Sequence, residues 1–89
     1  MLKFRTTNQF ERDYKRVLKR GNDEKIIVTV MTMLLQQEKL GPKHKDHILK
    51  GRYAGRRECH IEPDWLLIYK RTFDEIIFER TGTHSDLFE

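Results

Sequence analysis

The first half of the chain carries apolar residues at the spacing of amphipathic helices. Residues 2–5, Leu-Lys-Phe-Arg, alternate apolar and polar side chains, which predicts a short strand. Apolar residues then recur every three or four positions, and these positions share one helical face: Phe10, Tyr14, Val17 and Leu18. Asn8 and Glu11 have the spacing of a capping box at the start of this helix, and Gly21 ends it.

A second helix is predicted between Asp23, which caps it, and Gly41-Pro42, which stops it. Its apolar positions follow the helical period from Ile26 to Leu40. Residues 26–32 are rich in β-branched side chains and also fit a strand, but the length of the segment favours a helix. Two adjacent helices with a short connection predict an antiparallel hairpin.

The second half of the chain has the pattern of strands. Residues 43–55 are polar and glycine-containing, which indicates irregular structure. Strands are then predicted at 56–61, 65–71 and 75–81, with tight turns between them that make neighbouring strands antiparallel. The sequence therefore predicts one α+β domain over residues 1–89, with the two-helix antiparallel hairpin packed on a curved, mainly antiparallel four-stranded sheet.

Composition narrows the class of protein. The 89 residues suffice for one small domain, and no apolar run is long enough for a transmembrane helix, so no membrane association is expected. The N-terminus lacks the apolar segment of a secretory signal, and the single cysteine, Cys59, has no internal disulfide partner. Both features indicate the cytoplasm.

The charge is divided unevenly along the chain. Lys and Arg exceed Asp and Glu by six in residues 1–45, whereas residues 46–89 have an acidic excess of two. All four histidines lie between residues 44 and 84. A basic face beside a histidine-containing site suits a polyanion that is bound and then altered, although a basic helix surface also serves solubility alone.

Three histidines are candidates for acid–base chemistry: His47, His60 and His84. Strand alternation places His60 on the face opposite Cys59, together with Arg56 and Glu58. Taken singly, each histidine also fits a surface position without a role. The predicted meander, however, brings the strand ends near residues 60, 64 and 84 together, which favours a shared site.

Metal and cofactor sites are poorly supported. Three histidines and a carboxylate can hold zinc, but no two histidines have the i, i+4 spacing of a helical zinc motif and no Cys-x-x-Cys occurs. His44 and His47 lie beside Lys43 and Lys45, which repel a cation. Cys59 is predicted to face the core, where a thiol is inert. We therefore expect no metal and no cofactor.

Histidines and arginines without a metal suit RNA cleavage by the RNA's own 2′-hydroxyl. One group removes the 2′-OH proton, a second protonates the leaving 5′-oxygen, and cationic side chains stabilise the phosphorane. Trp65 or Phe88 is a candidate for stacking on an unpaired base, and Asp64 for orienting a histidine. The alternatives are core packing for Trp65, a terminal hydrophobic plug for Phe88 and turn formation for Asp64.

Three blocks of sequence resemble the YafQ branch of the RelE-type bacterial toxins of type II toxin–antitoxin systems: K-D-H-I-L-K-G (45–51), R-E-C-H-I-E-P-D-W-L-L-I-Y (57–69) and F-E-R-T-G-T-H-S-D-L-F (78–88). The resemblance implies a RelE-like fold and a ribosome-dependent endoribonuclease, an mRNA interferase that cuts translated mRNA in the ribosomal A site and inhibits translation. It also implies a cognate antitoxin that silences the toxin in a DNA-binding, autorepressing complex.

The resemblance also assigns residues. By motif, the family's catalytic and binding positions correspond to His47, His60, Asp64, Trp65, Arg80, His84 and Phe88. We expect His84 to be the general acid, His47 or His60 the general base, Arg80 the group that stabilises the phosphorane, and Asp64 the residue that orients a histidine. Arg56 and Glu58 are expected to bind substrate with Trp65 and Phe88. The first helix would contact ribosomal RNA through Lys15, Arg16, Lys19 and Arg20.

Two other functions remain open from the sequence. A small basic module that binds nucleic acid or an antitoxin without catalysis needs the lysines and arginines but has no use for three spaced imidazoles. A regulator that binds an acidic protein partner through its basic helices is compatible with either function.

Overall fold

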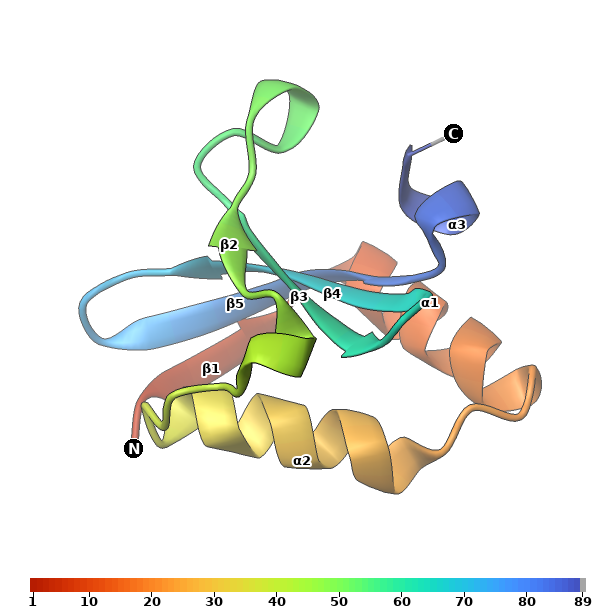
Figure 1. The fold of residues 1–89 in the computed structure, drawn as a ribbon, viewed down its shortest axis with the longest axis horizontal. Helices are drawn as coiled ribbons and strands as arrows, with labels where there is room; N and C mark the ends of the chain where they lie inside the picture. Colours follow the sequence, from red (N-terminus) through yellow and green to blue (C-terminus); the bar gives the residue numbers. More distant parts are fainter. Residues whose placement is uncertain (89) are drawn as a thin grey trace.

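A five-stranded sheet forms the centre of the protein, whose computed structural model describes residues 1–88 (Figure 1). The strands are β1 (Lys3–Thr6), β2 (His47–Ile48), β3 (Arg57–Glu62), β4 (Trp65–Arg71) and β5 (Glu75–Gly82). The helices are α1 (Asn8–Lys19), α2 (Glu24–Leu35) and α3 (His84–Phe88), with short 3-10 helices η1 (Pro42–His44) and η2 (Gly51–Tyr53).

The strands lie in the order β1-β5-β4-β3-β2. The last three strands along the chain form the predicted antiparallel meander, and β1 adds to it parallel to β5. The predicted α+β class and mainly antiparallel sheet are therefore confirmed. The predicted number of strands is one too low, because β2 pairs with β3 through two residues inside the segment that was expected to be irregular.

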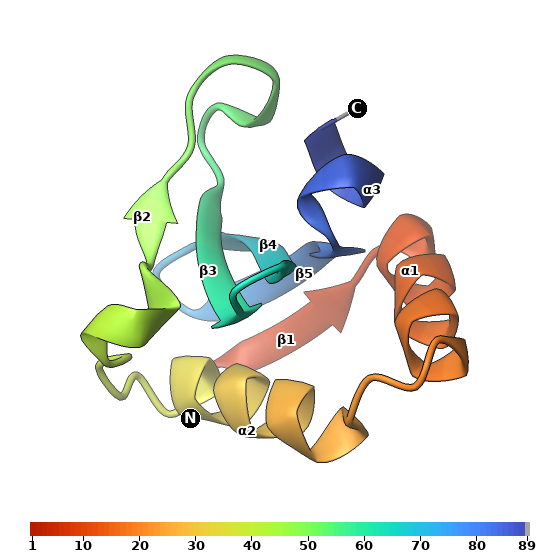
Figure 2. The same ribbon diagram turned by 45° about the vertical axis from the view of Figure 1, so that its right-hand side comes forward.

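The two faces of the sheet have different cover. Figures 1 and 2 show α1 and α2 on one side, and α3 with the loop at residues 49–56 on the other. The larger core lies under α1 and α2, where Phe10, Val17 and Ile27 pack against alternate strand residues such as Leu67 and Phe78. The two helices diverge from their connection at residues 20–23 in Figure 2, so the hairpin is an open one.

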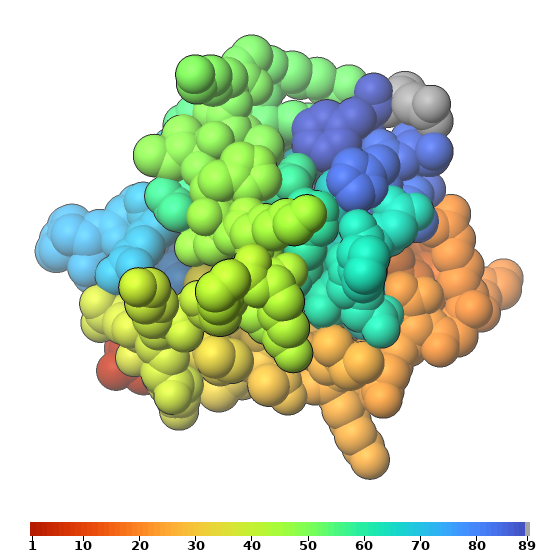
Figure 3. Space-filling model, viewed as in Figure 1, coloured from red at the N-terminus to blue at the C-terminus, as the bar shows by residue number. Residues whose placement is uncertain are grey.

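A smaller core forms on the opposite face. Leu66 and Ile68 of β4 pack there against Leu87 of α3, with Leu49 and Tyr53 beside them. Burial of Leu87 holds the short C-terminal helix on the sheet. The loop at 49–56 and the C-terminal segment thus adjoin the same face of the sheet, and Figure 3 shows both at one end of the molecule.

The helix ends differ from the prediction in two places. Thr7, not Asn8, caps α1, since its side chain accepts a hydrogen bond from the backbone N–H of Phe10 at 3.0 Å. Asp23 caps α2 as expected, but this helix ends at Leu35 and not near Leu40. Gln37 there adopts a left-handed conformation (φ 59°), and the N–H of Glu38 closes the end on the Met33 carbonyl.

A β-bulge in β5 decides which side chains reach the face of α3. Phe78 pairs with Tyr69 and Arg80 pairs with Ile68, so one extra residue, Glu79, sits between two successive pairs. A bulge of this kind shifts the alternation of side chains along the strand. Arg80 consequently shares a register row with Ile68, on the smaller core's face, while Thr81 contacts Trp65 in the larger core.

Candidate active site

The segment Arg80–Phe88 folds as a strand end, a cap and a short helix. The backbone N–H of Asp86 donates to Thr83 Oγ1 at 3.1 Å, and the N–H of Thr83 donates to Asp86 Oδ2 at 2.9 Å. This reciprocal pair is a capping box, which places His84 as the first residue of α3. The sequence Thr-His-Ser-Asp therefore fixes the backbone that presents the imidazole.

Asp64, in the turn between β3 and β4, holds His84. Its Oδ1 accepts from the His84 backbone N–H at 2.8 Å and lies 2.6 Å from the imidazole Nδ1. The two bonds from His84, the backbone one foremost, hold the pKa of the Asp64 carboxyl below its ordinary value. An ionised carboxylate only accepts, so Nδ1 carries hydrogen and Nε2 is the nitrogen that exchanges a proton.

His60 adjoins His84. The two rings meet edge to face with their centroids 5.6 Å apart, and the His60 side chain is 14% exposed. His60 lies on the face predicted by strand alternation, together with Glu58. The distance from His60 Nε2 to Glu58 Oε1 is 3.5 Å.

Glu58 connects two of the three histidines. Its Oε1 is also 3.8 Å from His47 Nε2, although its side chain is only 6% exposed. His47 Nδ1 lies 2.6 Å from the Lys45 carbonyl oxygen and donates to it, which fixes the tautomer of the neutral ring. The structure therefore brings His47, His60 and His84 into one cluster with two carboxylates.

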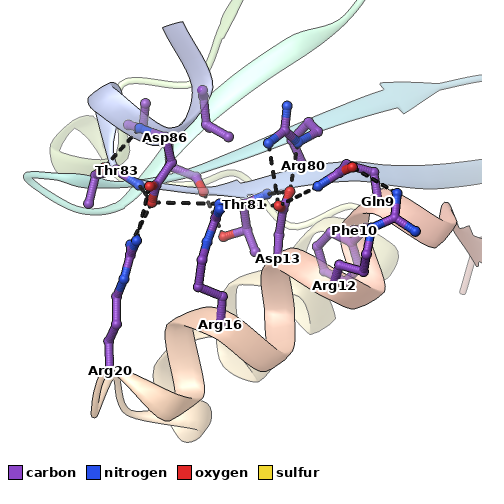
Figure 4. A network of polar contacts seen from close by, with 12 residues as sticks. Gln9, Phe10, Arg12, Asp13, Arg16, Arg20, Arg80, Thr81, Thr83 and Asp86 are labelled. Carbon is purple, nitrogen blue, oxygen red and sulfur yellow. Dashed lines mark hydrogen bonds and ion pairs between the residues drawn. The ribbon is translucent and has the colours of Figure 1, made fainter. Parts of the chain in front are cut away.

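Arg80 lies on the same face but is already paired. The sheet register aligns His47, Glu58, Ile68 and Arg80 in one row across four strands. The Nε and Nη2 of Arg80 donate to the two oxygens of Asp13 at 2.7 and 3.3 Å (Figure 4), and Nη1 donates to the Tyr53 hydroxyl at 3.3 Å. This pairing holds the guanidinium in one orientation and balances its charge.

Arg56 and Phe88 lie near the same face. The Nε of Arg56 donates to Glu79 Oε1 at 3.0 Å. The ring of Phe88 is 44% exposed and meets the Tyr53 ring edge-on, with centroids 5.6 Å apart. The exposed part of Phe88 is available to a ligand.

Trp65 does not belong to the site. It is 2% exposed in the larger core, and its indole N–H donates to Thr81 Oγ1 at 2.9 Å. Strand alternation places Trp65, the first residue of β4, on the face of α1 and α2, opposite to His60. The prediction that its ring stacks on a base is therefore wrong.

The four cations predicted to contact ribosomal RNA divide into two pairs. Arg20 binds both oxygens of Asp86 at 2.6 and 3.1 Å, and Arg16 lies 3.2 Å from Asp13 and 3.8 Å from Asp86. Both arginines are thus engaged within the protein, and their contact with ribosomal RNA stays a prediction. Lys15 and Lys19 are exposed, and neither belongs to an ion pair among residues 1–88.

Within the described chain, no three His, Cys, Asp or Glu side chains are placed so that together they could hold a metal ion. Cys59 is fully buried, and burial raises the pKa of its thiol to about 12. Such a thiol supplies almost no thiolate near neutral pH, so it is unsuited to nucleophilic attack.

Several residues beside the site were missed from the sequence: Asp13, Tyr53, His44 and Asp86. Asp13 had a visible signal, because it lies three residues after Phe10 and four before Val17 and so falls on the apolar face of α1. His44 is also buried, with Nδ1 2.7 Å from the His60 carbonyl oxygen. Nothing in the local sequence indicates that contact.

An imidazole bound to a carboxylate, a second imidazole beside it and nearby cationic side chains form a set suited to general acid–base chemistry. Comparison with known proteins identifies the family. Residues 2–89 match the family described as bacterial toxin of type II toxin–antitoxin system, YafQ. The chain therefore belongs to the YafQ family of bacterial toxins.

The relatives cover nearly the whole chain. The mRNA interferase toxin YafQ of Escherichia coli K12 is 43% identical over 83 residues, which are 92% of this chain and 90% of that protein. A crystal structure of E. coli YafQ superposes with a TM-score of 0.94 at 39% identity, and YafQ in the E. coli DinJ–YafQ complex with 0.92 at 40%, each covering both chains completely. The resemblance predicted from residues 45–88 is confirmed and extends through the helical half.

Proposed function

We propose that this protein is an mRNA interferase that cleaves translated mRNA in the ribosomal A site and so inhibits translation. The observation that carries the proposal is the contact of His84 with Asp64, with the His60 ring 5.6 Å from the His84 ring. Two proton-transfer groups side by side suit a reaction that needs a base at the 2′-hydroxyl and an acid at the 5′-oxygen. The E. coli relative at 43% identity is named an mRNA interferase toxin.

The reaction begins when a base takes the 2′-OH proton and the 2′-oxygen attacks the adjacent phosphorus. We assign the role of base to His60, whose ring adjoins that of His84. His47 is the alternative, because its Nε2 lies near the same Glu58 oxygen as the Nε2 of His60. His84 then gives the proton on its Nε2 to the leaving 5′-oxygen, so the products are a 2′,3′-cyclic phosphate and a 5′-hydroxyl. Asp64, which accepts from Nδ1 of His84, orients the ring for that transfer.

The remaining residues bind and stabilise. Arg80, oriented by Asp13, faces the charge that develops on the phosphorane, while Arg56 and Glu58 line the substrate side of the sheet. The exposed part of Phe88 stacks on an unpaired base. Lys15 and Lys19 contact ribosomal RNA phosphates from the outer face of α1.

Primer extension on translated mRNA tests the mechanism. Replacing His84 by Ala removes the proposed acid, so we expect cleavage to slow by roughly 10²–10⁴-fold. His60→Ala should slow it as strongly and His47→Ala less, while Asp74→Asn, in the distant β4–β5 turn, serves as the control. Equal cleavage by wild type and His84→Ala, or equal cleavage without ribosomes, would contradict the proposal.

We also propose a cognate antitoxin as partner, because the E. coli relative is found in a DinJ–YafQ complex. The toxin–antitoxin complex would bind DNA and repress its own synthesis. The free toxin would act in the cytoplasm on 70S ribosomes. Among residues 1–88, no helix has the length and apolar character needed to cross a membrane.

A further inference from the structure

We propose that Arg20 of α1 and Asp86 of α3 form a clamp that positions His84 for catalysis. The Nη1 of Arg20 donates to Asp86 Oδ2 at 2.6 Å, and Nη2 donates to Oδ1 at 3.1 Å (Figure 4). A two-point contact of this kind fixes orientation as well as distance. The inference rests on the proposed catalytic role of His84, and it makes Arg20 and Asp86 positioning residues.

Asp86 is bound tightly to the backbone that carries His84. Its carboxylate accepts the Thr83 N–H, and its own N–H donates to the Thr83 hydroxyl, on either side of His84 in sequence. Its side chain is only 12% exposed. A displacement of Asp86 therefore moves the backbone of His84, and with it the imidazole that contacts Asp64.

The α3 helix depends on such anchors because it has only five residues. A helix this short is unstable alone, so its position is set by what it packs against. The buried side chain of Leu87 and the hydrogen bond from the Tyr53 hydroxyl to the Leu87 carbonyl hold its C-terminal part. The Arg20–Asp86 pair holds the N-terminal turn, where His84 lies.

The other end of the clamp is rigid. Asp13, Arg16 and Arg20 are spaced three and four residues apart and so share one face of α1. Asp13 attaches that face to β5 through Arg80 and the Thr81 N–H, and Arg16 lies between Asp13 and Asp86. The α1 helix thus connects Arg80 to Asp86 through one chain of ion pairs, and the cap between Asp86 and Thr83 extends this connection to His84.

This arrangement favours a clamp over a phosphate contact for Arg20. The two nitrogens that would bind a phosphate already bind a carboxylate, whose pKa they hold well below its ordinary value. An RNA phosphate would have to displace Asp86 first. Lys15 and Lys19 carry no such partner within the described chain.

The test compares Arg20→Gln and Asp86→Asn with Arg12→Gln. The Asn variant keeps an oxygen for the cap, and Arg12 is a matched control on the same helix, whose guanidinium donates to Gln9. Cleavage kinetics on translating ribosomes give kcat and KM, and an NMR titration of the purified toxin follows the Asp64 carboxyl. The NMR readout needs no activity. The charge of Asp86 by itself raises the pKa of Asp64, so a rise in Asp86→Asn cannot come from the lost charge alone.

We expect Arg20→Gln and Asp86→Asn to lower kcat by roughly 10- to 100-fold with KM unchanged, because His84 is displaced from its partner. The pKa of Asp64 should rise towards its ordinary value in both variants, since it is lowered by its bonds from His84. Arg20→Lys should restore part of kcat, and Arg12→Gln should match wild type in both measurements.

Two results would overturn the clamp. A raised KM with unchanged kcat in Arg20→Gln would make Arg20 a phosphate contact, and an unchanged Asp64 titration in both variants would show that His84 had not moved. Failure of the proposed function is a separate outcome: His84→Ala would then cleave like wild type, while the Asp64 titration would still decide whether the clamp positions His84.

Discussion

At position 82 the backbone of β5 passes so close to α3 that a side chain has no room. A Cβ there would lie 2.7 Å from Asp86 Oδ2 and 2.9 Å from Asp86 Cβ, and the φ of Gly82 is 156°. Asp86 has little freedom to retreat, because Arg20 and the Thr83 N–H both hold its carboxylate. The glycine is therefore what permits α3 to follow β5 directly.

Gly82→Ala should destabilise the protein by about 1–3 kcal/mol, since either the strand end or the cap must shift. It should also slow cleavage, because the shift displaces His84. Urea denaturation measures the first effect, with Gly41→Ala as the control: position 41 has no atom within 4 Å of the added Cβ and a negative φ. Equal stability of the two variants would contradict the argument.

At the residue scale, the sequence predicts the positions of those side chains that depend on strand alternation. It does not predict the side chains whose position depends on the bulge in β5 or on partners far along the chain. Alternation correctly placed Glu58 and His60 on one face of β3, opposite to Cys59. The same rule, applied to β4, would have placed Trp65 in the core. The partner of Arg80 was not predictable, since Asp13 lies 67 residues away and the bulge at Glu79 re-aims the strand.

At the element scale, α1 is attached to β5 by a buried charged group. The Asp13 carboxylate is 1% exposed and accepts hydrogen bonds from Arg80, Arg16, Gln9 and the Thr81 N–H. Removing one partner of such a pair leaves the other charge without compensation in a poorly solvated place. The attachment thus depends on both charges being present.

Asp13→Ala should lower the free energy of unfolding by about 3–5 kcal/mol. Lys15→Ala, an exposed change two residues along the same helix, should stay within about 0.5 kcal/mol of wild type. Chemical denaturation of both variants checks this expectation. If Asp13→Ala were as stable as Lys15→Ala, the ion pair would not hold α1 on the sheet.

The contact between α1 and α3 should also be visible in the pH dependence of stability. Arg20 holds the pKa of Asp86 below its ordinary value, so the folded state favours the ionised form. The resulting stabilisation is complete above the unfolded value of about 3.9 and is lost as the pH falls from there through the native pKa.

Wild type should therefore exceed Asp86→Asn in stability by a constant margin between pH 5 and pH 7, and the margin should narrow below about pH 4. Urea denaturation of both proteins at pH 7, 5 and 3 measures it. A margin that does not change down to pH 3 would show that the ion pair contributes nothing to folding.

The sequence predicted elements where a long pattern exists and missed them where it does not. The strands β3, β4 and β5 follow clear alternation or long apolar runs, and each was placed to within a residue or so. The β2 strand has only two residues, too few for alternation to show. The end of α2 was misplaced because Leu40 keeps the helical period, while the left-handed residue that stops the helix is Gln37 and not a glycine.

At the scale of the whole molecule, the net charge of +4 overstates what is available to a polyanion. Many cations on the described surface are already paired, among them Arg5 with Glu75, Arg57 with Asp46 and Arg20 with Asp86. Lys15 and Lys19 on the outer face of α1 are exposed and outside these pairs. Binding to the ribosome should therefore depend more on them than on the arginines of the same helix.

Replacing both lysines by Gln should weaken ribosome binding and reduce the slope of log K against log salt concentration by about 1.5, as expected for two lost phosphate contacts. Lys25→Gln, an exposed change on α2, is the control for loss of charge alone. Binding measured across a series of salt concentrations gives the slopes. An unchanged slope in the double variant would place the ribosome contact on another surface.

The parallel pair of β1 and β5 has a consequence for how the protein is made. Lys3 pairs with Glu75 and Thr6 with Phe78, so the first strand to leave the ribosome finds its neighbour only when almost the whole chain has followed. The residues of the proposed site also lie after residue 46, and the clamp closes only at Asp86. A nascent chain thus lacks both the finished sheet and the assembled cluster until the residues up to Asp86 have left the ribosome.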